Sequence, residues 1–120
     1  MYRKWGGEAE FFVVYIREAH PWSRKTKKKG KTILPEPSTL GERQKHGQIC
    51  RNDLKLSIPM LLDGMDNKAG EAYAAWPDRI YVVDRAGRIA FRGGPGPFGF
   101  RPADAEKSLR MLLGRWPGIL

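Results

Sequence analysis

The sequence predicts a domain of the α/β class, and two local patterns carry that prediction. The first is an apolar run, residues 11–16, which is rich in β-branched and aromatic side chains and has charged residues on each side. Such a run is typical of a strand buried on both faces, as in the parallel part of a sheet. The second is the segment 79–92, where two short strand-like runs flank a tight turn at 84–87 and predict a β-hairpin.

The remaining elements alternate helices and strands along the chain. Residues 1–5 are expected to be the last turn of a helix, because Gly6-Gly7 follows them. A second helix is predicted over about residues 40–55, with Thr39 or Ser38 as its N-cap and Glu42 as the capping-box partner. Its inward face is expected to consist of apolar side chains, namely Leu40, Ile49 and Leu54.

The second half of the chain predicts a short strand over 58–62, then a short helix that Asp66 or Asn67 caps and that ends at Ala75. The dipeptide Trp76-Pro77 stops this helix, because the residue before a proline disfavours helical geometry. A last helix is predicted over about 102–113. Its buried stripe is expected to be Ala105, Leu109, Leu112 and Leu113.

Positive charge is concentrated in one segment. Of the formal net charge of +9, a contribution of +6 comes from Arg24, Lys25, Lys27, Lys28, Lys29 and Lys31. We interpret residues 22–38 as a basic, proline-rich loop insertion within a single domain of residues 1–120. The run has no interleaved aromatic side chains for base stacking, so the pattern favours a solvated loop over a nucleic-acid site.

Hydropathy and cysteine usage exclude several classes of protein. The longest apolar run, 11–16, is too short to cross a bilayer, and the first residues have no signal-peptide core. The chain as given is therefore expected to be soluble and cytoplasmic. Cys50 is the single cysteine, which excludes an internal disulfide and a cysteine-based zinc site. We expect no metal and no bound cofactor.

Four strings, in order along the chain, resemble the iodothyronine deiodinase family. Residues 12–21, FVVYIREAHP, are similar to the family signature, an apolar strand followed by Tyr-Ile-Glu-Glu-Ala-His-Pro. The other three are 58–67 (IPMLLDGMDN), 72–82 (AYAAWPDRIYV) and 88–98 (RIAFRGGPGPF). The resemblance implies a thioredoxin-like fold, a mixed central sheet flanked by helices, in which Pro77 is the cis proline before the third core strand. Arg17 replaces one glutamate of the signature, and the lysine run replaces the residues that usually follow His-Pro.

The resemblance also implies that the N-terminal strand and most of the first helix are missing, and with them the selenocysteine or cysteine nucleophile. The chain alone is then expected to be an inactive, clipped fragment. In the thioredoxin topology the missing strand lies between the strands at 11–16 and 79–83, so both would expose an unpaired edge. Residues 1–120 by themselves are therefore expected to aggregate or to remain molten.

In its intact form the protein would perform selenol- or thiol-dependent redox chemistry, according to the resemblance. The substrate would be a small halogenated aromatic compound in reductive deiodination, or a peroxide in related thiol-peroxidase or oxidoreductase chemistry, with an external thiol as reductant. The Ala-, Arg- and Gly-rich composition fits a bacterial member. The alternative is a non-catalytic thioredoxin-fold binding module that uses the basic loop for an anionic partner, and a dimer stays open in either case.

Candidate site residues come from three parts of the chain. The resemblance implies that His20 contacts substrate or assists proton transfer, and the alternative is a surface histidine before a loop. Glu18 would orient His20 or form a surface pair with Arg17. Cys50 is interpreted as a buried structural residue, with a resolving thiol as the alternative.

The third part is aromatic. Trp76, beside Pro77, and Phe98, in the glycine- and proline-rich loop 93–100, are candidates for a pocket that stacks an aromatic substrate. Packing within the core or anchoring of the loops is the alternative role for these rings.

Overall fold

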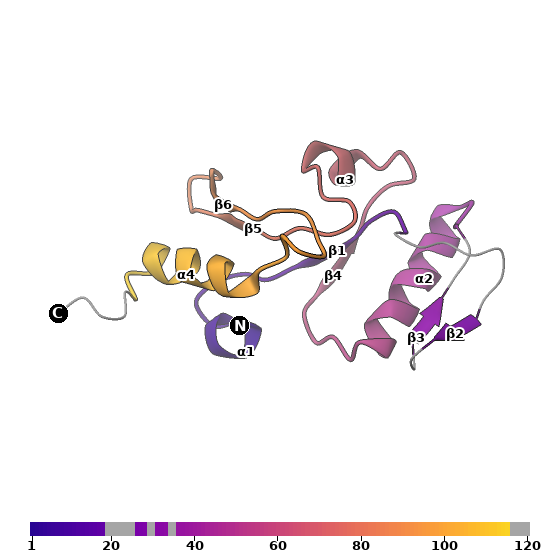
Figure 1. The fold of residues 1–120 in the computed structure, drawn as a ribbon, viewed down its shortest axis with the longest axis horizontal. Helices are drawn as coiled ribbons and strands as arrows, with labels where there is room; N and C mark the ends of the chain where they lie inside the picture. Colours follow the sequence, from indigo (N-terminus) through magenta and orange to yellow (C-terminus); the bar gives the residue numbers. More distant parts are fainter. Residues whose placement is uncertain (19–25, 29–30, 34–35, 116–120) are drawn as a thin grey trace. The chain divides into compact units, whose positions relative to one another are not determined.

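The computed structural model describes residues 1–18, 26–28, 31–33 and 36–115, and gives the backbone alone for 26–28 and 31–33 (Figure 1). Three ladders of two strands each form there: β1–β4 is parallel, whereas β2–β3 and β5–β6 are antiparallel. Helices flank these strands, so the α/β class predicted from the sequence is confirmed. The elements are α1 (Tyr2–Trp5), β1 (Val13–Tyr15), β2 (Thr26–Lys28), β3 (Lys31–Ile33), α2 (Leu40–Asp53), β4 (Met60–Leu62), α3 (Lys68–Ala72), β5 (Tyr81–Val83), β6 (Ile89–Arg92) and α4 (Pro102–Leu112).

The contacts divide the chain into two compact units. Phe11–Tyr73 contains the β1–β4 ladder and is called here the parallel unit. Met1–Glu10 and Ala74–Leu120 together contain the β5–β6 hairpin and are called the hairpin unit.

Strand β1 of the parallel unit is covered on one face. Val13 N donates to Pro59 O at 3.0 Å, and Tyr15 lies opposite Leu62 in the ladder with β4. The prediction that this strand is buried on both faces is wrong, because Phe12 and Val14 are exposed. Successive side chains of a strand alternate between its faces, and α2 packs on the face that carries Tyr15.

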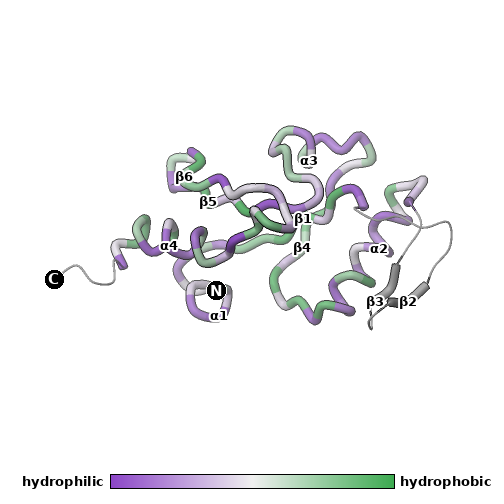
Figure 2. The backbone as a smooth tube through the Cα atoms, viewed as in Figure 1, coloured by the Kyte–Doolittle hydropathy of each residue, from purple (hydrophilic) through white to green (hydrophobic). Residues whose placement is uncertain are grey.

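Helix α2 begins and ends where the sequence predicts, and Thr39 Oγ1 accepts a hydrogen bond from Glu42 N at 3.1 Å as its N-cap. Its inward face is not the predicted one. Leu40 and Leu54 are exposed and Ile49 is half-buried, whereas the buried residues are Arg43, His46 and Gly47. Figure 2 accordingly shows hydrophilic colours along much of this helix.

Helix α2 lies against the sheet at Gly47. A Cβ at this position would lie 3.4 Å from Tyr15 Cγ and 3.5 Å from Met60 Sδ, which are ordinary van der Waals separations. The long side chain of Arg43, one turn earlier, then reaches the turn after β4.

Within the predicted basic loop, the structure forms two short strands, β2 and β3. Thr26 pairs with Ile33 and Lys28 with Lys31, and β3 packs against α2. The sequence analysis predicted no strand in this segment. Threonine and isoleucine favour strands, and the density of charge hid this signal. The rest of the Lys-rich run lies outside the described residues.

The hairpin unit confirms the predicted β-hairpin. Gly87 has φ +81°, which favours glycine, and Asp84 Oδ1 accepts hydrogen bonds from Ala86 N and Arg88 N at 2.9 Å each. These bonds close the turn between β5 and β6.

Helix α4 packs on both strands of this hairpin. Ala105 and Leu109 are buried, as predicted, and Leu113 is half-buried. Leu112 is exposed, so its place in the buried stripe was predicted wrongly. The inward row repeats every fourth residue from Ala105 to Leu113, and Leu112 lies to one side of it.

The short helix α1 is fixed to α4 by one buried ring. Trp5 is buried, and its Nε1 donates to Glu106 Oε2 at 2.7 Å. The ammonium of Lys4 and the guanidinium of Arg110 lie 5.3 Å and 5.8 Å from the ring centroid, within the range of cation–π contacts. The predicted helical turn before Gly6 is confirmed.

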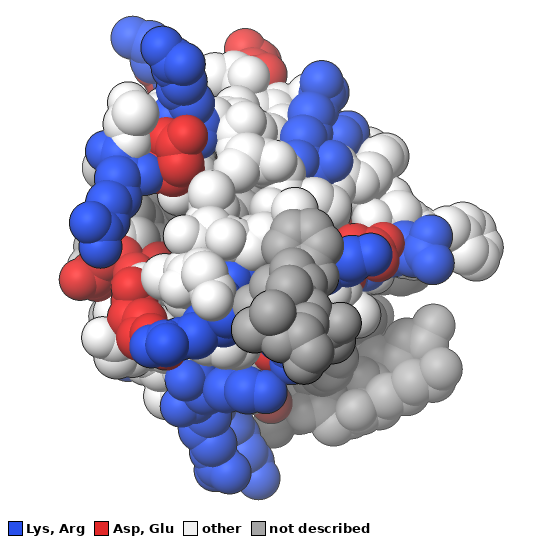
Figure 3. All heavy atoms as spheres, turned by 90° about the vertical axis from the view of Figure 1, so that its left-hand side faces the viewer, with Lys and Arg blue, Asp and Glu red and all other residues white. Residues whose placement is uncertain are grey.

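Basic side chains of the described residues are dispersed. On the face drawn in Figure 3, Lys and Arg stand in separate groups, several of them beside Asp or Glu. Three ion pairs of the hairpin unit are of this kind: Arg101–Asp104, Arg110–Glu106 and Arg115–Glu8. None of the described helices has the length and apolar character that crossing a bilayer requires.

Candidate functional site

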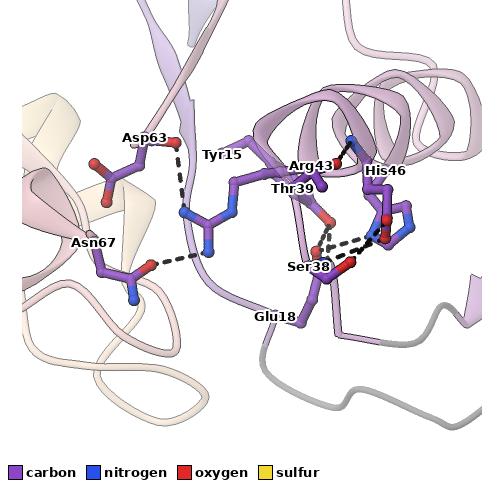
Figure 4. Close-up of polar contacts among 9 residues, drawn as sticks. Tyr15, Glu18, Ser38, Thr39, Arg43, His46, Asp63 and Asn67 are labelled. Carbon is purple, nitrogen blue, oxygen red and sulfur yellow. Dashed lines mark hydrogen bonds and ion pairs between the residues drawn. The ribbon is translucent and has the colours of Figure 1, made fainter. Parts of the chain in front are cut away.

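Polar side chains gather where the parallel strands β1 and β4 end (Figure 4). In open α/β sheets, binding crevices lie outside the carboxyl ends of the strands. We name this group the carboxyl-edge cluster, and its members are Tyr15, Glu18, Arg43, His46, Asp63 and Asn67.

Tyr15 and Glu18 form the first contact of the cluster. The phenol is the last residue of β1, and its hydroxyl donates to both oxygens of the Glu18 carboxylate, at 2.7 Å and 2.5 Å. Burial raises the pKa of Tyr15 far above its usual range, and the hydrogen bond to the Glu18 carboxylate raises it further. Tyr15 is therefore a neutral donor throughout the physiological range of pH.

His46 approaches the same carboxylate from α2. Its Nδ1 lies 3.5 Å from Glu18 Oε1, and the two side chains are only 10% and 14% exposed. Within the described part of the chain, this Nδ1 has no hydrogen-bond partner at shorter distance and is buried. Glu18 thus lies between a phenol and an imidazole in a site that is largely shielded from water.

Arg43 supports the cluster from the same helix. The side chain is 1% exposed, and its guanidinium donates to Gly64 O at 2.6 Å, to Asn67 Oδ1 at 2.9 Å and, at a longer 3.4 Å, to Asp63 O. All three acceptors belong to the segment between β4 and α3. Arg43 therefore ties α2 to that turn and is too deeply buried to meet a ligand.

The Asp63 carboxylate fixes the start of α3. Its two carboxylate oxygens accept hydrogen bonds from Ala69 N at 3.0 Å and Gly70 N at 2.8 Å. Asn67 was predicted as the cap of this helix and does occupy the N-cap position, but its side chain binds Arg43 instead. A Cβ on Gly70 would lie 3.2 Å from Asp63 Oδ2, so glycine permits the close approach of this carboxylate. Helix α3 ends at Ala72, earlier than the predicted Ala75.

The arrangement separates structural from chemical groups. Arg43 binds Asn67 and the backbone at Gly64, Asp63 binds the backbone of α3, and these bonds fix the segment between β4 and α3. Glu18 and His46 are titratable groups in contact, and residues of these two types serve as general acids and bases in enzymes. In the described residues no group of three or more His, Cys, Asp and Glu side chains could hold a metal ion.

The structure places the predicted site residues in different parts of the chain. Glu18 belongs to the carboxyl-edge cluster, with Tyr15 and His46 as its partners. His20 lies outside the described residues, so its role stays a prediction. Cys50 lies half-buried on α2, one helical turn after His46. Its role as a resolving thiol stays a prediction.

Trp76, Pro77 and Phe98 lie in the hairpin unit. The Trp76–Pro77 peptide bond is cis, as the resemblance implies, and a second cis bond, Gly96–Pro97, occurs in the glycine-rich loop. Gly96 N donates to Asp78 O at 3.0 Å, which joins the two proline loops. Phe98 is 94% exposed and Trp76 is 45% exposed, so both rings offer surface for stacking.

Sequence reasoning missed most of the cluster. The inward face of α2 was predicted from its apolar residues. Arg43 and His46 are three residues apart on this helix, and that spacing places them on one face. Asp63 follows a predicted strand directly and was interpreted only as its end. Polar residues at strand ends and on one helix face were the available signals.

Comparison with known proteins gives one consistent result. A family model described as iodothyronine deiodinase matches residues 1–115. The chain is similar to a thyroxine 5-deiodinase of Sparus aurata (36% identity over 84% of this chain and 37% of that protein). It is also similar to a type II iodothyronine deiodinase of Petromyzon marinus (35% identity over 92% of the chain and 38% of the relative). The chain thus spans little more than a third of the length of these curated relatives.

Proposed function

Because the chain belongs to the iodothyronine deiodinase family, we propose that it supplies the substrate-side part of a thioredoxin-like redox enzyme. The reaction is reductive removal of iodide from a small aromatic substrate by a selenol or thiol of the enzyme. An external thiol then regenerates this selenol or thiol. The nucleophile comes from residues that precede Met1 in the intact protein. Family membership supports the redox class, and the identity of the halogenated substrate rests on the names of the relatives.

One observation carries the proposal beyond family membership: the Glu18 carboxylate is held in a shielded position where β1 ends. Reductive dehalogenation replaces a carbon–halogen bond by a carbon–hydrogen bond, so it consumes a proton at the aromatic ring. A buried carboxylate between a phenol and an imidazole can hold or move that proton.

The test is iodide release by the extended protein. The reading frame is extended upstream of Met1, any selenocysteine is replaced by cysteine, and release of iodide from thyroxine is measured with dithiothreitol as reductant. Glu18→Gln should lower kcat at least 10-fold with little change in the melting temperature, because glutamine keeps the shape but cannot carry the proton. Glu36→Gln is the matched control, since Glu36 is an exposed glutamate of the same unit.

Two results would contradict the proposal. Absence of iodide release together with turnover of hydrogen peroxide would assign thiol-peroxidase chemistry instead. Full activity of Glu18→Gln would remove Glu18 from the reaction.

A further inference from the structure

We infer that His46 is the positioning residue of Glu18, and that its protonation state sets the hydrogen bond between Glu18 and Tyr15. The inference deepens the proposed function, on which it rests, because it concerns regulation of the same site by pH. His46 is 8% exposed, and its Nδ1 faces Glu18 Oε1 at 3.5 Å (Figure 4).

The geometry makes the carboxylate a shared acceptor. Glu18 Oε1 accepts from the Tyr15 hydroxyl at 2.7 Å and is also the oxygen nearest to His46. A protonated imidazole presents an N–H and a positive charge to this oxygen, whereas a neutral imidazole whose Nδ1 is bare presents a lone pair. The first arrangement attracts the carboxylate and the second repels it, so the two protonation states of His46 favour different positions of Glu18.

Because histidine side chains in general change charge between pH 5 and 8, this is the range in which the response of the pair to pH is tested. Among the described residues this buried Nδ1 has no hydrogen-bond partner, whereas a buried imidazole with a purely structural function is normally satisfied by a hydrogen bond, and this difference supports the role. Tyr15 stays protonated over the same range, because burial and Glu18 raise its pKa. The phenol therefore reports the position of Glu18 without titrating itself.

Other charged groups near His46 are few in the described residues. Glu42 lies one turn earlier on α2, and His46 contributes to lowering the pKa of this carboxyl, although hydrogen bonds from Ser38 lower it more. Arg43 and Cys50 belong to the same helix as His46. Strand β4 supplies no titratable side chain, and the residue of that kind in β3, which also packs on α2, is Lys31.

The experiment follows the Tyr15 hydroxyl by NMR in the protein expressed from its full reading frame. The hydroxyl proton is recorded from pH 5 to 8 together with the imidazole nitrogens of His46. In the wild type, the hydroxyl resonance should shift with the same midpoint as the imidazole nitrogens. In His46→Leu and in His46→Gln, at least four-fifths of this shift should be lost, while His46→Gln keeps the hydroxyl bonded to Glu18. Gln48→Leu, an exposed change on the same helix, should behave as the wild type.

A pH-dependent shift that persists unchanged in His46→Gln would overturn the inference, and this variant keeps a polar side chain should leucine disturb folding. A second measurement separates the inference from the proposed function. Binding of a halogenated phenol is titrated at pH 5.5 and 7.5, and wild-type affinity should differ at least threefold between them, with the difference abolished in His46→Gln. Absence of binding at both pH values, with NMR coupling intact, would refute the proposed function alone. Binding without coupling would refute the role of His46 alone.

Discussion

Replacing Arg43 by leucine should loosen the whole carboxyl edge of the parallel unit. The guanidinium makes two short hydrogen bonds, to Gly64 O at 2.6 Å and to Asn67 Oδ1 at 2.9 Å. A bond from a charged donor contributes roughly 1.5–3 kcal/mol, so the pair contributes about 3–6 kcal/mol. Leucine avoids the burial of a charge, which offsets part of this sum. We expect a net loss of about 3 kcal/mol.

Hydrogen exchange of the protein expressed from its full reading frame measures this loss locally. The amides of Ala69 and Gly70 donate to the Asp63 carboxylate, whose position depends on the turn that Arg43 holds. A loss of about 3 kcal/mol corresponds to exchange of these amides roughly 100-fold faster. Arg43→Lys, which keeps the charge but not the planar fork, should lie between the wild type and the leucine variant.

The control is Arg51→Leu on the same helix. Arg51 is exposed and reaches Leu56 O only at 3.4 Å, so its replacement should change stability by less than about 0.5 kcal/mol. Equal protection of Ala69 and Gly70 in the Arg43 and Arg51 variants would show that the buried guanidinium does not hold the turn.

Three further results are expected. Leu109→Ala should destabilise the hairpin unit by about 2–4 kcal/mol in urea denaturation, whereas Leu112→Ala should cost less than about 1 kcal/mol, and equal effects would contradict the burial seen here. The hydrogen bond from Trp5 lowers the pKa of Glu106, so the bond stabilises the fold at neutral pH, and this contribution is lost as pH falls below about 4 through the lowered pKa. Melting temperatures of wild type and Trp5→Phe between pH 3 and 7 should therefore converge on the acid side. Because the pKa of Tyr15 is raised in the folded protein, the neutral phenol contributes fully to the stability of the fold below about pH 10. This contribution is lost only at higher pH. Tyr15→Phe should accordingly leave phenolate absorbance at pH 11 unchanged as long as the protein stays folded.

Much of the fold could be predicted because local chemistry determined it. The hairpin followed from strand-forming residues on each side of Asp84 and Gly87, and the turn has the bonds that those residue types supply. The N-cap at Thr39 likewise depends on one side chain and one backbone amide three residues later. Signals of this kind lie within a few residues of one another, so a single sequence contains them.

The errors have a common cause in tertiary context. The inward face of α2 was assigned to Leu40 and Leu54 by hydropathy, but their burial depended on a partner surface that the sequence does not display. Arg43 is buried because its acceptors, near Gly64 and Asn67, are about 20 residues away in the chain and adjacent in space. A contact of that separation cannot be recognised from periodicity.

The candidate site was predicted least well for the same reason. The family signature indicates Glu18, whereas the sequence pattern marks Tyr15 only as part of an apolar strand, without its bond to Glu18. His46 shares one face of the helix with Arg43, but the 3.5 Å approach to Glu18 that gives it importance cannot be seen from that spacing. Proximity of this kind is a property of the fold.

The polar inward face of α2 also fixes the register of this helix. An apolar stripe can slide along a sheet with little change in contact, whereas Arg43 binds acceptors at Gly64 and Asn67 and His46 lies against Glu18. Rotation of the helix by a single residue would break these contacts. A graft of this helix into another scaffold would therefore have to include the segment from Asp63 to Asn67, because that segment supplies the acceptors of Arg43.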